Sequence, residues 1–172
     1  DIRIAVESLT HEDILVLNTH WHYDHIGGNR LFDKIGISPF ENHLLNLRWN
    51  NSLLMNIYVN PCREEGNAFP HDFMAEKYEI QGVEPTFFMN DGDNIDLGDR
   101  ALRVIATPGH THGSLSFLDT RTNSLFTGDL VHSEAPIYAH FEDSDIEEYI
   151  TSINRLLSKD IEFYRIYPSH SS

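Results

Sequence analysis

The sequence predicts an α/β fold in which helices cover β-sheet layers. Short apolar segments alternate with turn residues over 85–127, which is typical of a sheet of short strands. An amphipathic pattern then predicts a helix at 145–157, and a last strand-like run covers 163–167. Strands mixed with helices indicate a layered architecture. With 172 residues, of which 40% are apolar, the chain is expected to form one domain, 1–172.

The first half of the chain predicts fewer strands and more helix. Residues 2–9 have the apolar spacing of a helix end, and residues 13–19 (DILVLNT) predict a buried strand. A short helix is expected near Asn29, and a short strand at 35–38. Residues 41–58 carry leucines and an isoleucine with helix-like spacing, so they predict one long helix.

The second half begins with residues 60–82, which contain two prolines and two glycines and predict an irregular stretch. Such stretches often shape pockets. Ser144 and Glu147 have the spacing of a capping box at the start of the last helix. Five short strands are expected in this half before that helix: 86–89, 95–97, 102–107, 115–119 and 124–127.

The composition argues against several kinds of partner. The formal net charge is −15, so a nucleic-acid surface, which needs clustered Lys and Arg, is not expected. No run of 18 apolar residues occurs, so neither a membrane-spanning helix nor a membrane partner is expected. Cys62 is the only cysteine and cannot form a disulfide within the chain, which fits a cytoplasmic location. The sequence carries no signal for an oligomeric state.

The strongest chemical signal is the run HWHYDH at residues 20–25, directly after the first predicted strand. Alternate residues of an extended segment point the same way, so His20 and His22 can grip one ion. Asp24 and His25 can face a second ion once the backbone turns at the two glycines that follow. Imidazole and carboxylate suit zinc, and also iron or manganese. A polar loop rich in histidine is the simpler alternative, but this cluster behind a strand favours metal binding.

Two ions need more ligands than one hexapeptide supplies. His110, Asp129 and His170 each stand just past a predicted strand, as His20 does. Each is weak evidence by itself, because a lone Gly-Asp is usually a turn and a lone histidine is usually structural. The repetition of the pattern at several strand ends favours one shared site.

These segments resemble the metal motifs of the metallo-β-lactamase superfamily, in the order that family has: THWHYDHIGG, TPGHTHGS, TGD and YPSH. The resemblance covers residues 13–170. It implies an αββα sandwich with the site at one edge, between two sheets. It also implies two divalent metal ions, with zinc favoured over iron or manganese.

The resemblance divides the candidate ligands into three sets. The first ion would take three histidines: His20, His22 and His110. The second ion would take Asp24, His25 and His170, and Asp129 would bridge the two ions.

This ligand set favours an acyl hydrolase. Flavodiiron relatives have glutamate in place of His22, and β-lactamases of the family usually lack Asp129. The pattern is more similar to glyoxalase II, acyl-homoserine lactonases and acyl-CoA thioesterases. The resemblance therefore implies a binuclear metal-dependent hydrolase acting on a small acyl substrate. In it, a metal-bound hydroxide attacks the carbonyl of an ester, thioester or lactone, and Asp24 is the catalytic residue that orients the water or carries a proton.

Three other functions stay open. An iron-dependent sulfur (persulfide) dioxygenase shares the fold and most ligands, but it normally uses one metal. A phosphodiesterase is less favoured because the net charge is −15 and basic stretches are absent. A non-enzymatic binding module is disfavoured by the complete ligand set.

Several neighbouring residues have two readings. Ser114 and Ser116 are expected to pack or hydrogen-bond near His110, since no Gly-x-Ser-x-Gly nucleophile motif is present. Trp21 and Tyr23 are expected to pack, with Tyr23 near the mouth of the site. His112 would lie either behind a ligand or in solvent. His132, Tyr138 and His140 follow Asp129 in the sequence and could line the pocket. Tyr138 could also donate a hydrogen bond to a substrate oxygen. Three histidines are expected at the surface or on helices: His11, His43 and His71.

The ends of the chain also bear on the expected fold. Members of the superfamily usually begin with several strands and an Asp-x-Gly segment, which do not occur here, and the chain stops two residues past His170. We therefore expect a fragment of a longer protein, whose exposed sheet edges would make it unstable by itself.

Overall fold

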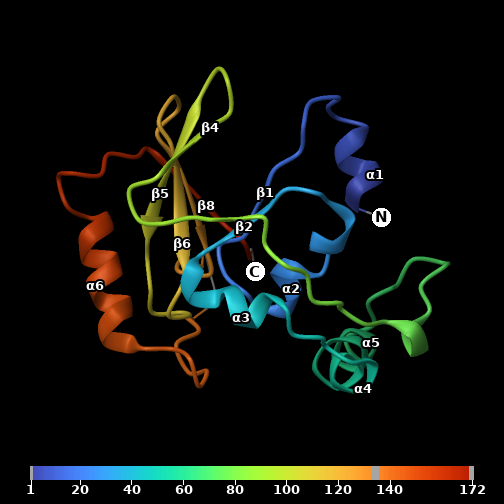
Figure 1. The fold of residues 1–172 in the computed structure, drawn as a ribbon. Coiled ribbons are helices and arrows are strands. Elements are labelled where there is room, and N and C mark those ends of the chain that lie inside the picture. Colours follow the sequence, from blue (N-terminus) through green and yellow to red (C-terminus); the bar gives the residue numbers. More distant parts are fainter. Residues whose placement is uncertain (1, 133–135, 171–172) are drawn as a thin grey trace.

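Two β-sheets packed face to face, with helices on their outer sides, build the protein in the computed structural model (Figure 1). The structure describes residues 2–132 and 136–170. The order of layers is helices, a three-stranded sheet, a five-stranded sheet and a last helix. The αββα architecture expected from the family resemblance is therefore confirmed.

The smaller sheet is parallel, in the order β1-β2-β3. Its strands are β1 (Val16–Leu17), β2 (Ile35–Ile37) and β3 (Phe87–Phe88). Every residue of β2 is buried, because this central strand is covered by helices on one face and by the second sheet on the other. Burial on both faces explains why its sequence, IGI, has no polar residue.

The larger sheet contains five strands in chain order: β4 (Asn94–Asp96), β5 (Ala101–Ala106), β6 (Leu115–Asp119), β7 (Ser124–Gly128) and β8 (Arg165–Pro168). The pairs from β4 to β7 are antiparallel, whereas β7 and β8 are parallel. It follows that β5, β7 and β8 all run in the same direction. Their carboxyl ends lie at one edge of the sheet.

Three apolar clusters fill the spaces between the four layers. Successive residues of β5 point to opposite faces of the sheet, as a strand requires. Val104 joins the cluster between the sheets, with Met89 and Phe117, whereas Ile105 packs toward Tyr149 of α6 (Ile146–Leu156). Figure 1 shows α6 alone on the outer side of the larger sheet. The third cluster joins the outer face of β2 to the helices beyond it: Ile26, Ile35, Ile37, Leu45, Leu54 and Ile80.

Most expected elements are present, with shifted ends. The strand expected at 13–19 shrinks to β1, and the helix expected at 2–9 is α1 (Ile2–Glu7). The helix expected near Asn29 is a 3-10 turn, η1 (Asn29–Leu31). One short helix inside the HWHYDH segment was not expected: α2 (Tyr23–Ile26). Two further 3-10 turns are η2 (Pro39–Glu41) and η4 (Ala75–Lys77).

The prediction of a single long helix at 41–58 is wrong. The segment forms α3 (Asn42–Leu45), α4 (Asn51–Leu54) and a π-helical turn, η3 (Met55–Val59). The chain leaves the helix between α3 and α4 because Trp49 and Ile80 exchange backbone hydrogen bonds of 2.9 and 3.1 Å. Asn50 then caps the next helix by accepting from the backbone N–H of Leu53.

The stretch expected to be irregular at 60–82 opens with a helix, α5 (Asn60–Glu64). The helix α5 continues directly from the π-helical turn η3, and Pro61 is its second residue. From the end of α5 to residue 82 the chain is irregular, apart from η4 and the bridge at Ile80.

The capping residue of the last helix also differs from the expected one. Asp145, not Ser144, caps α6, and its carboxylate accepts from the backbone N–H groups of Glu147 and Glu148 at 2.8 and 3.0 Å. Ser144 instead donates its hydroxyl to the carbonyl of His110 at 2.8 Å. The helix begins one residue later than the pattern indicated, which frees Ser144 to hold the His110 turn.

No helix in the described ranges has both the length and the apolar character that crossing a membrane requires.

We predict that the turn before His110 depends on Gly109. Its φ is +135°, and an added Cβ would lie 2.5 Å from the backbone nitrogen of Tyr149 in α6. Gly92 is the matched control, since its φ is +86° and nothing lies within 4 Å of an added Cβ. Gly92→Ala should cost about 1–2 kcal/mol of strain, and Gly109→Ala about 1–3 kcal/mol more for overpacking. Urea unfolding measures both, and equal losses would contradict the close approach.

Candidate metal centre

The candidate ligands gather where strands of both sheets end. His110, Asp129 and His170 follow β5, β7 and β8, whose carboxyl ends share one edge of the larger sheet. His20 follows β1 of the smaller sheet. The backbone N–H of Leu115 donates to the carbonyl of Thr19 at 2.9 Å, which ties the chain just before His20 to the larger sheet.

Buried polar groups hold the His20–His25 loop in place. Asn18, at the end of β1, donates its amide to the carbonyl of Gly36 at 3.0 Å and accepts from the amide of Asn29 at 3.0 Å. The helix α2 then begins at Tyr23, so the backbone turns between His22 and Asp24. This turn places the second half of the motif on a different side of the cluster from the first half.

Seven side chains meet at this edge, in three overlapping groups of possible ligands. Within each group, the ligand atoms all lie within 4.8 Å of one another. The groups are His20, His22 and His110; His20, His25 and Asp129; and Asp24, His25 and His170. The first and third groups coincide with the two ligand sets that the family resemblance implied.

His110 is oriented by a backbone group outside the motif. Its Nδ1 lies 2.7 Å from the carbonyl oxygen of Tyr138, which can only accept, so Nδ1 carries the proton. The lone pair of Nε2 is then free, and it points to within 3.0 Å of Nδ1 of His22. Fixing the tautomer in this way is typical of metal-binding histidines.

Asp129 lies between the two ligand sets. One of its carboxylate oxygens is 3.2 Å from Nε2 of His25, and the other is 3.6 Å from Nε2 of His110 and 3.4 Å from Nε2 of His170. On the far side, Nε2 of His170 lies 3.2 Å from the carboxylate of Asp24. The carboxylate of Asp129 therefore faces ligands of both sets.

Burial keeps the histidines of the first set uncharged. Desolvation, followed by the charges of neighbouring histidines, moves the pKa of His20 well below its ordinary value of 6.5. Desolvation and the charge of His110 lower the pKa of His22 to about 4. For His25, desolvation also lowers the pKa, but the close approach and the charge of the Asp129 carboxylate, 3.2 Å away, outweigh it, so the net shift is upward. At neutral pH the first set thus offers nitrogen lone pairs.

The buried atoms of the cluster fit a metal ion. Nε2 of His20 and Oδ1 of Asp129 are buried, and neither makes a hydrogen bond of ordinary geometry within residues 2–132 and 136–170. Leaving a buried polar atom unsatisfied costs about 1–3 kcal/mol. A cation would satisfy both atoms, and a set of imidazoles and carboxylates is the donor chemistry that zinc prefers.

A cavity of about 1040 Å³ opens from the cluster. Five of the candidate ligands line it: His22, Asp24, His110, Asp129 and His170. Five apolar side chains also line it and form what we call the apolar wall: Trp21, Leu44, Trp49, Leu53 and Ile57. A molecule in this cavity would contact the candidate ligands and the apolar wall together.

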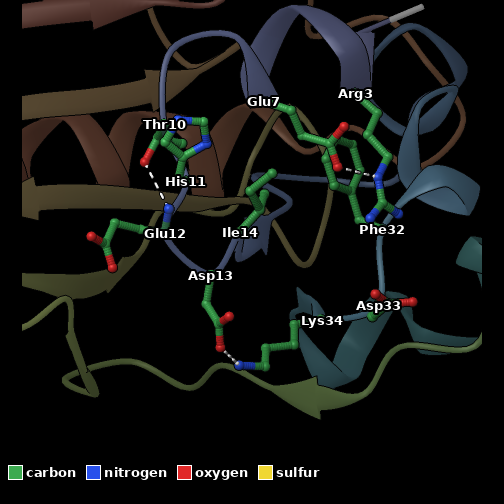
Figure 2. Close-up of a pocket in the computed structure, with 10 residues that line it drawn as sticks. All are labelled: Arg3, Glu7, Thr10, His11, Glu12, Asp13, Ile14, Phe32, Asp33 and Lys34. Atoms are coloured by element: carbon green, nitrogen blue, oxygen red, sulfur yellow. Dashed lines mark hydrogen bonds and ion pairs between the residues drawn. The ribbon is translucent and has the colours of Figure 1, made fainter.

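A second cavity, of about 450 Å³, lies beside α1 (Figure 2). Its basic residues pair with acidic ones: Arg3 with Glu7 at 2.8 Å, and Lys34 with Asp13 at 2.6 Å. None of the possible metal-binding groups in the described part of the chain includes a residue of this cavity. It therefore offers no comparable chemistry.

The other residues singled out in the sequence either line the larger cavity or pack against neighbouring side chains. Trp21 and Tyr23 pack against Trp49, as expected, and both also line the larger cavity. His132 and Tyr138 line that cavity too, whereas His140 is exposed and stacks on Phe141.

Three residues near His110 have structural partners. Ser114 and Ser116 hydrogen-bond to Thr111 and Thr107 inside the core. His112 is exposed and lies 3.2 Å from the carboxylate of Glu148. His11, His43 and His71 are exposed, and His43 also reaches the cavity.

Three contributors to the site were not expected from the sequence. The carbonyl of Tyr138 orients His110, and Asp143 accepts from the indole N–H of Trp21 at 2.8 Å. Glu41 is buried behind the His110 turn. A backbone carbonyl carries no sequence signal, and Glu41 is followed by the polar residues Asn42 and His43, so its burial leaves no local signal either.

Comparison with known proteins gives the same family as the motifs. Residues 14–170 match the family described as the metallo-beta-lactamase superfamily. The human protein named acyl-coenzyme A thioesterase MBLAC2 is 32% identical over 155 residues, which cover 90% of this chain and 54% of that protein. Hydroxyacylglutathione hydrolase from Rhodospirillum rubrum is 29% identical over 129 residues, covering 75% of this chain and 38% of that protein. This chain thus spans about half the length of the human relative and less than half the length of the bacterial one.

Solved structures share the fold. The crystal structure of TTHA1623 in a di-iron-bound form superimposes with a TM-score of 0.67 at 21% identity, covering 99% of this chain and 77% of that one. ETHE1 from Myxococcus xanthus superimposes with a TM-score of 0.57 at 20% identity, covering 100% of this chain and 60% of that one. At these identities the likeness concerns the fold alone.

The lowered pKa of His22 predicts that the metal-free protein loses stability in acid. A histidine whose pKa is about 4 when folded and 6.5 when unfolded takes up its proton first in the unfolded state. Stability should therefore fall as the pH drops from 6.5 through 4, with up to about 3 kcal/mol from this residue. Urea unfolding in a chelator across this pH range should show a flatter profile for His22→Gln than for the wild type. His112→Gln controls for removal of an imidazole, and a wild-type slope in His22→Gln would contradict the shift.

Proposed function

Because the chain belongs to the metallo-β-lactamase superfamily, we propose that it is a metal-dependent hydrolase, with thioesters of apolar acyl groups as its preferred substrates. One observation carries the proposal: metal-capable side chains of the cluster line a cavity that also has an apolar wall. A carbonyl could lie at the cluster while its acyl chain lies against that wall. Zinc is the metal that this histidine-rich set favours.

The proposed ligands follow the groups that converge at the strand ends. His20, His22 and His110 would hold one ion. Asp24, His25 and His170 would hold the other, with Asp129 between them. When bound, such ions lower the pKa of water and polarise a carbonyl oxygen.

Asp24 is the proposed proton carrier. Its side chain is 28% exposed, lines the cavity and lies 3.2 Å from His170. Asp129, by contrast, is 7% exposed and is surrounded by histidines. The more open carboxylate is the better placed of the two to exchange a proton with substrate or solvent, so Asp24 would accept the proton of the attacking water and pass it to the leaving group.

The apolar wall would hold the acyl group and exclude water. Trp21 and Trp49 stack with ring centroids 5.6 Å apart, and Leu53 and Ile57 continue the surface they form. Each buried CH₂ group of an acyl chain contributes about 0.8 kcal/mol to binding. The wall therefore favours acyl groups of several carbons over acetyl.

The names of relatives support acyl transfer to water. The human relative is named an acyl-coenzyme A thioesterase, and the bacterial one a hydroxyacylglutathione hydrolase. The charges that line the cavity bear on which thiol carrier, charged or uncharged, the substrate has. No Lys or Arg of the described ranges lines it, whereas Glu142 and Asp143 do. An uncharged thiol carrier should therefore fit the described part of the cavity as well as a polyanionic one.

A panel of matched substrates tests the function. We expect the purified full-length protein to hydrolyse octanoyl-CoA, octanoyl-N-acetylcysteamine or both, faster than a lactone or bis(p-nitrophenyl) phosphate. A chelator should abolish hydrolysis, and Zn²⁺ should restore it. Asp24→Asn should lower kcat by at least about a hundredfold, because it removes the proton carrier. Free thiol release measures the rate.

Three results would overturn this function: hydrolysis that survives chelation, a phosphodiester as the best substrate, or consumption of O₂ with a persulfide. The last result would instead identify the dioxygenase alternative.

The apolar wall predicts a change in chain-length preference. Leu53→Trp should fill the cavity and lower kcat/KM for the octanoyl thioester relative to the acetyl thioester by about tenfold, since roughly two CH₂ groups lose their contacts. Leu47→Trp is the matched control, because Leu47 is exposed and does not line the cavity. An unchanged octanoyl-to-acetyl ratio in Leu53→Trp would show that the acyl chain binds elsewhere.

A further inference from the structure

Glu41 is a buried acid outside the ligand set. It ends the turn η2 and is only 1% exposed. Carboxylates are rarely buried this far without a charged partner. Yet no Lys, Arg or His of the described chain forms an ion pair with Glu41. Desolvation raises the pKa of its carboxyl group to about 7, although hydrogen bonds from neighbouring groups oppose the shift. A costly group of this kind needs a reason to be there.

The carboxylate of Glu41 binds the turn that follows His110. Its Oε1 accepts from the hydroxyl of Thr111 and from the backbone N–H of Gly113, the latter at 3.2 Å. The hydroxyl of Thr111 also lies 2.7 Å from that of Ser114, which accepts from the backbone N–H of Thr111 at 3.2 Å. Each of these three partners is buried. The side chain of Glu41, 70 residues from Thr111 in the sequence, therefore holds the segment TPGHTHGS by hydrogen bonds.

Gly113 shows how close this contact is. A Cβ added at Gly113 would lie 2.9 Å from Cδ of Glu41, a distance that real Cβ atoms essentially never show. The glycine after His110 thus makes room for the glutamate. The two residues are 72 positions apart, so the fit depends on the fold and not on local chain geometry.

The same carboxylate also faces the other ligand segment. The backbone N–H of Trp21 lies near enough to favour its charged form, although Oε2 makes no hydrogen bond of ordinary geometry among the described residues. Trp21 stands between His20 and His22. One carboxylate therefore accepts hydrogen bonds from the His110 turn and lies close to the backbone of the His20–His22 segment.

We propose that Glu41 is a positioning residue, whose carboxylate holds the turn after His110 against the His20–His22 segment so that the three imidazoles face one point. The proposal rests on the metal-dependent function proposed above. At Oε1 it needs an acceptor for Thr111 and Gly113, and on the other side it needs a group that does not repel the nearby N–H of Trp21. A carboxylate provides two acceptors, whereas an amide of the same shape provides one acceptor and one donor.

Glu41→Gln is the central variant, because either orientation of its amide places a donor against a donor in one of the two segments. Thr111→Val removes the hydroxyl from the same contact, and Thr111→Ser keeps it. Leu118→Ala is the control for general destabilisation, since Leu118 packs toward α6 on the outer face of the sheet. The readout is the Zn²⁺ dissociation constant, measured by competition with a chromophoric chelator under conditions where each variant is folded.

We expect Glu41→Gln and Thr111→Val to weaken Zn²⁺ binding by about tenfold to a hundredfold, as loss of a group that orients a ligand does. Thr111→Ser should stay near the wild type, and Leu118→Ala should bind Zn²⁺ normally despite a lower unfolding midpoint. Wild-type affinity in Glu41→Gln, or an equal loss in Leu118→Ala, would overturn the positioning role.

A second readout needs no metal. In the chelated protein, the amide hydrogens of residues 109–114 should exchange faster in Glu41→Gln than in the wild type, and unchanged exchange would also overturn the proposal. Failure of the proposed function looks different: the wild type itself would bind no Zn²⁺ or hydrolyse no acyl substrate. If Glu41→Gln does not fold, the comparison of Thr111→Val with Thr111→Ser carries the same test.

Discussion

Holding uncharged imidazoles together at a buried point is the constraint on which the structure depends. The rings of His20, His22 and His110 lie with each pair of centroids 4.8 Å apart and nearly perpendicular to one another. Protonated rings at such distances would repel, and burial already disfavours their charged forms. The rings must therefore stay neutral, with lone pairs directed inward. Without a cation this arrangement leaves buried atoms unsatisfied, and a cation would turn the same arrangement into a stabilising one.

The fold meets this constraint by strand direction and not by any single element. Because β5, β7 and β8 run the same way, their carboxyl ends deliver His110, Asp129 and His170 to one edge. The hydrogen bond from Leu115 to Thr19 brings the end of β1 from the other sheet to that edge. The outer layers then define what surrounds the cluster: α6 supports the turn before His110, while the broken helical segment from α3 to η3 supplies the apolar wall.

Residues whose chemistry and local pattern agree could be predicted from the sequence. The ligand segments could be located because metal-capable side chains directly follow short apolar strands, and the structure brings all seven together. Features that depend on contacts with residues far away in the sequence could not be predicted. The pairing of Trp49 with Ile80 interrupts a segment whose leucine spacing fitted one helix. The backbone carbonyl of Tyr138 contacts His110 from 28 residues away. The buried Glu41 binds Thr111, 70 residues away, in the turn after His110. Neither contact leaves a local signal in the sequence. The cap of α6 was misplaced by one residue because Ser144 and Asp145 are both good capping residues.

The central claim is that the strand ends form a two-ion site with Asp129 between the ions. Anomalous X-ray diffraction at the zinc edge, from crystals of the Zn²⁺-loaded protein, tests it most directly. The account predicts two peaks, one enclosed by His20, His22 and His110 and the other by Asp24, His25 and His170, with the carboxylate of Asp129 reaching both. A single peak, or peaks away from these side chains, would contradict it.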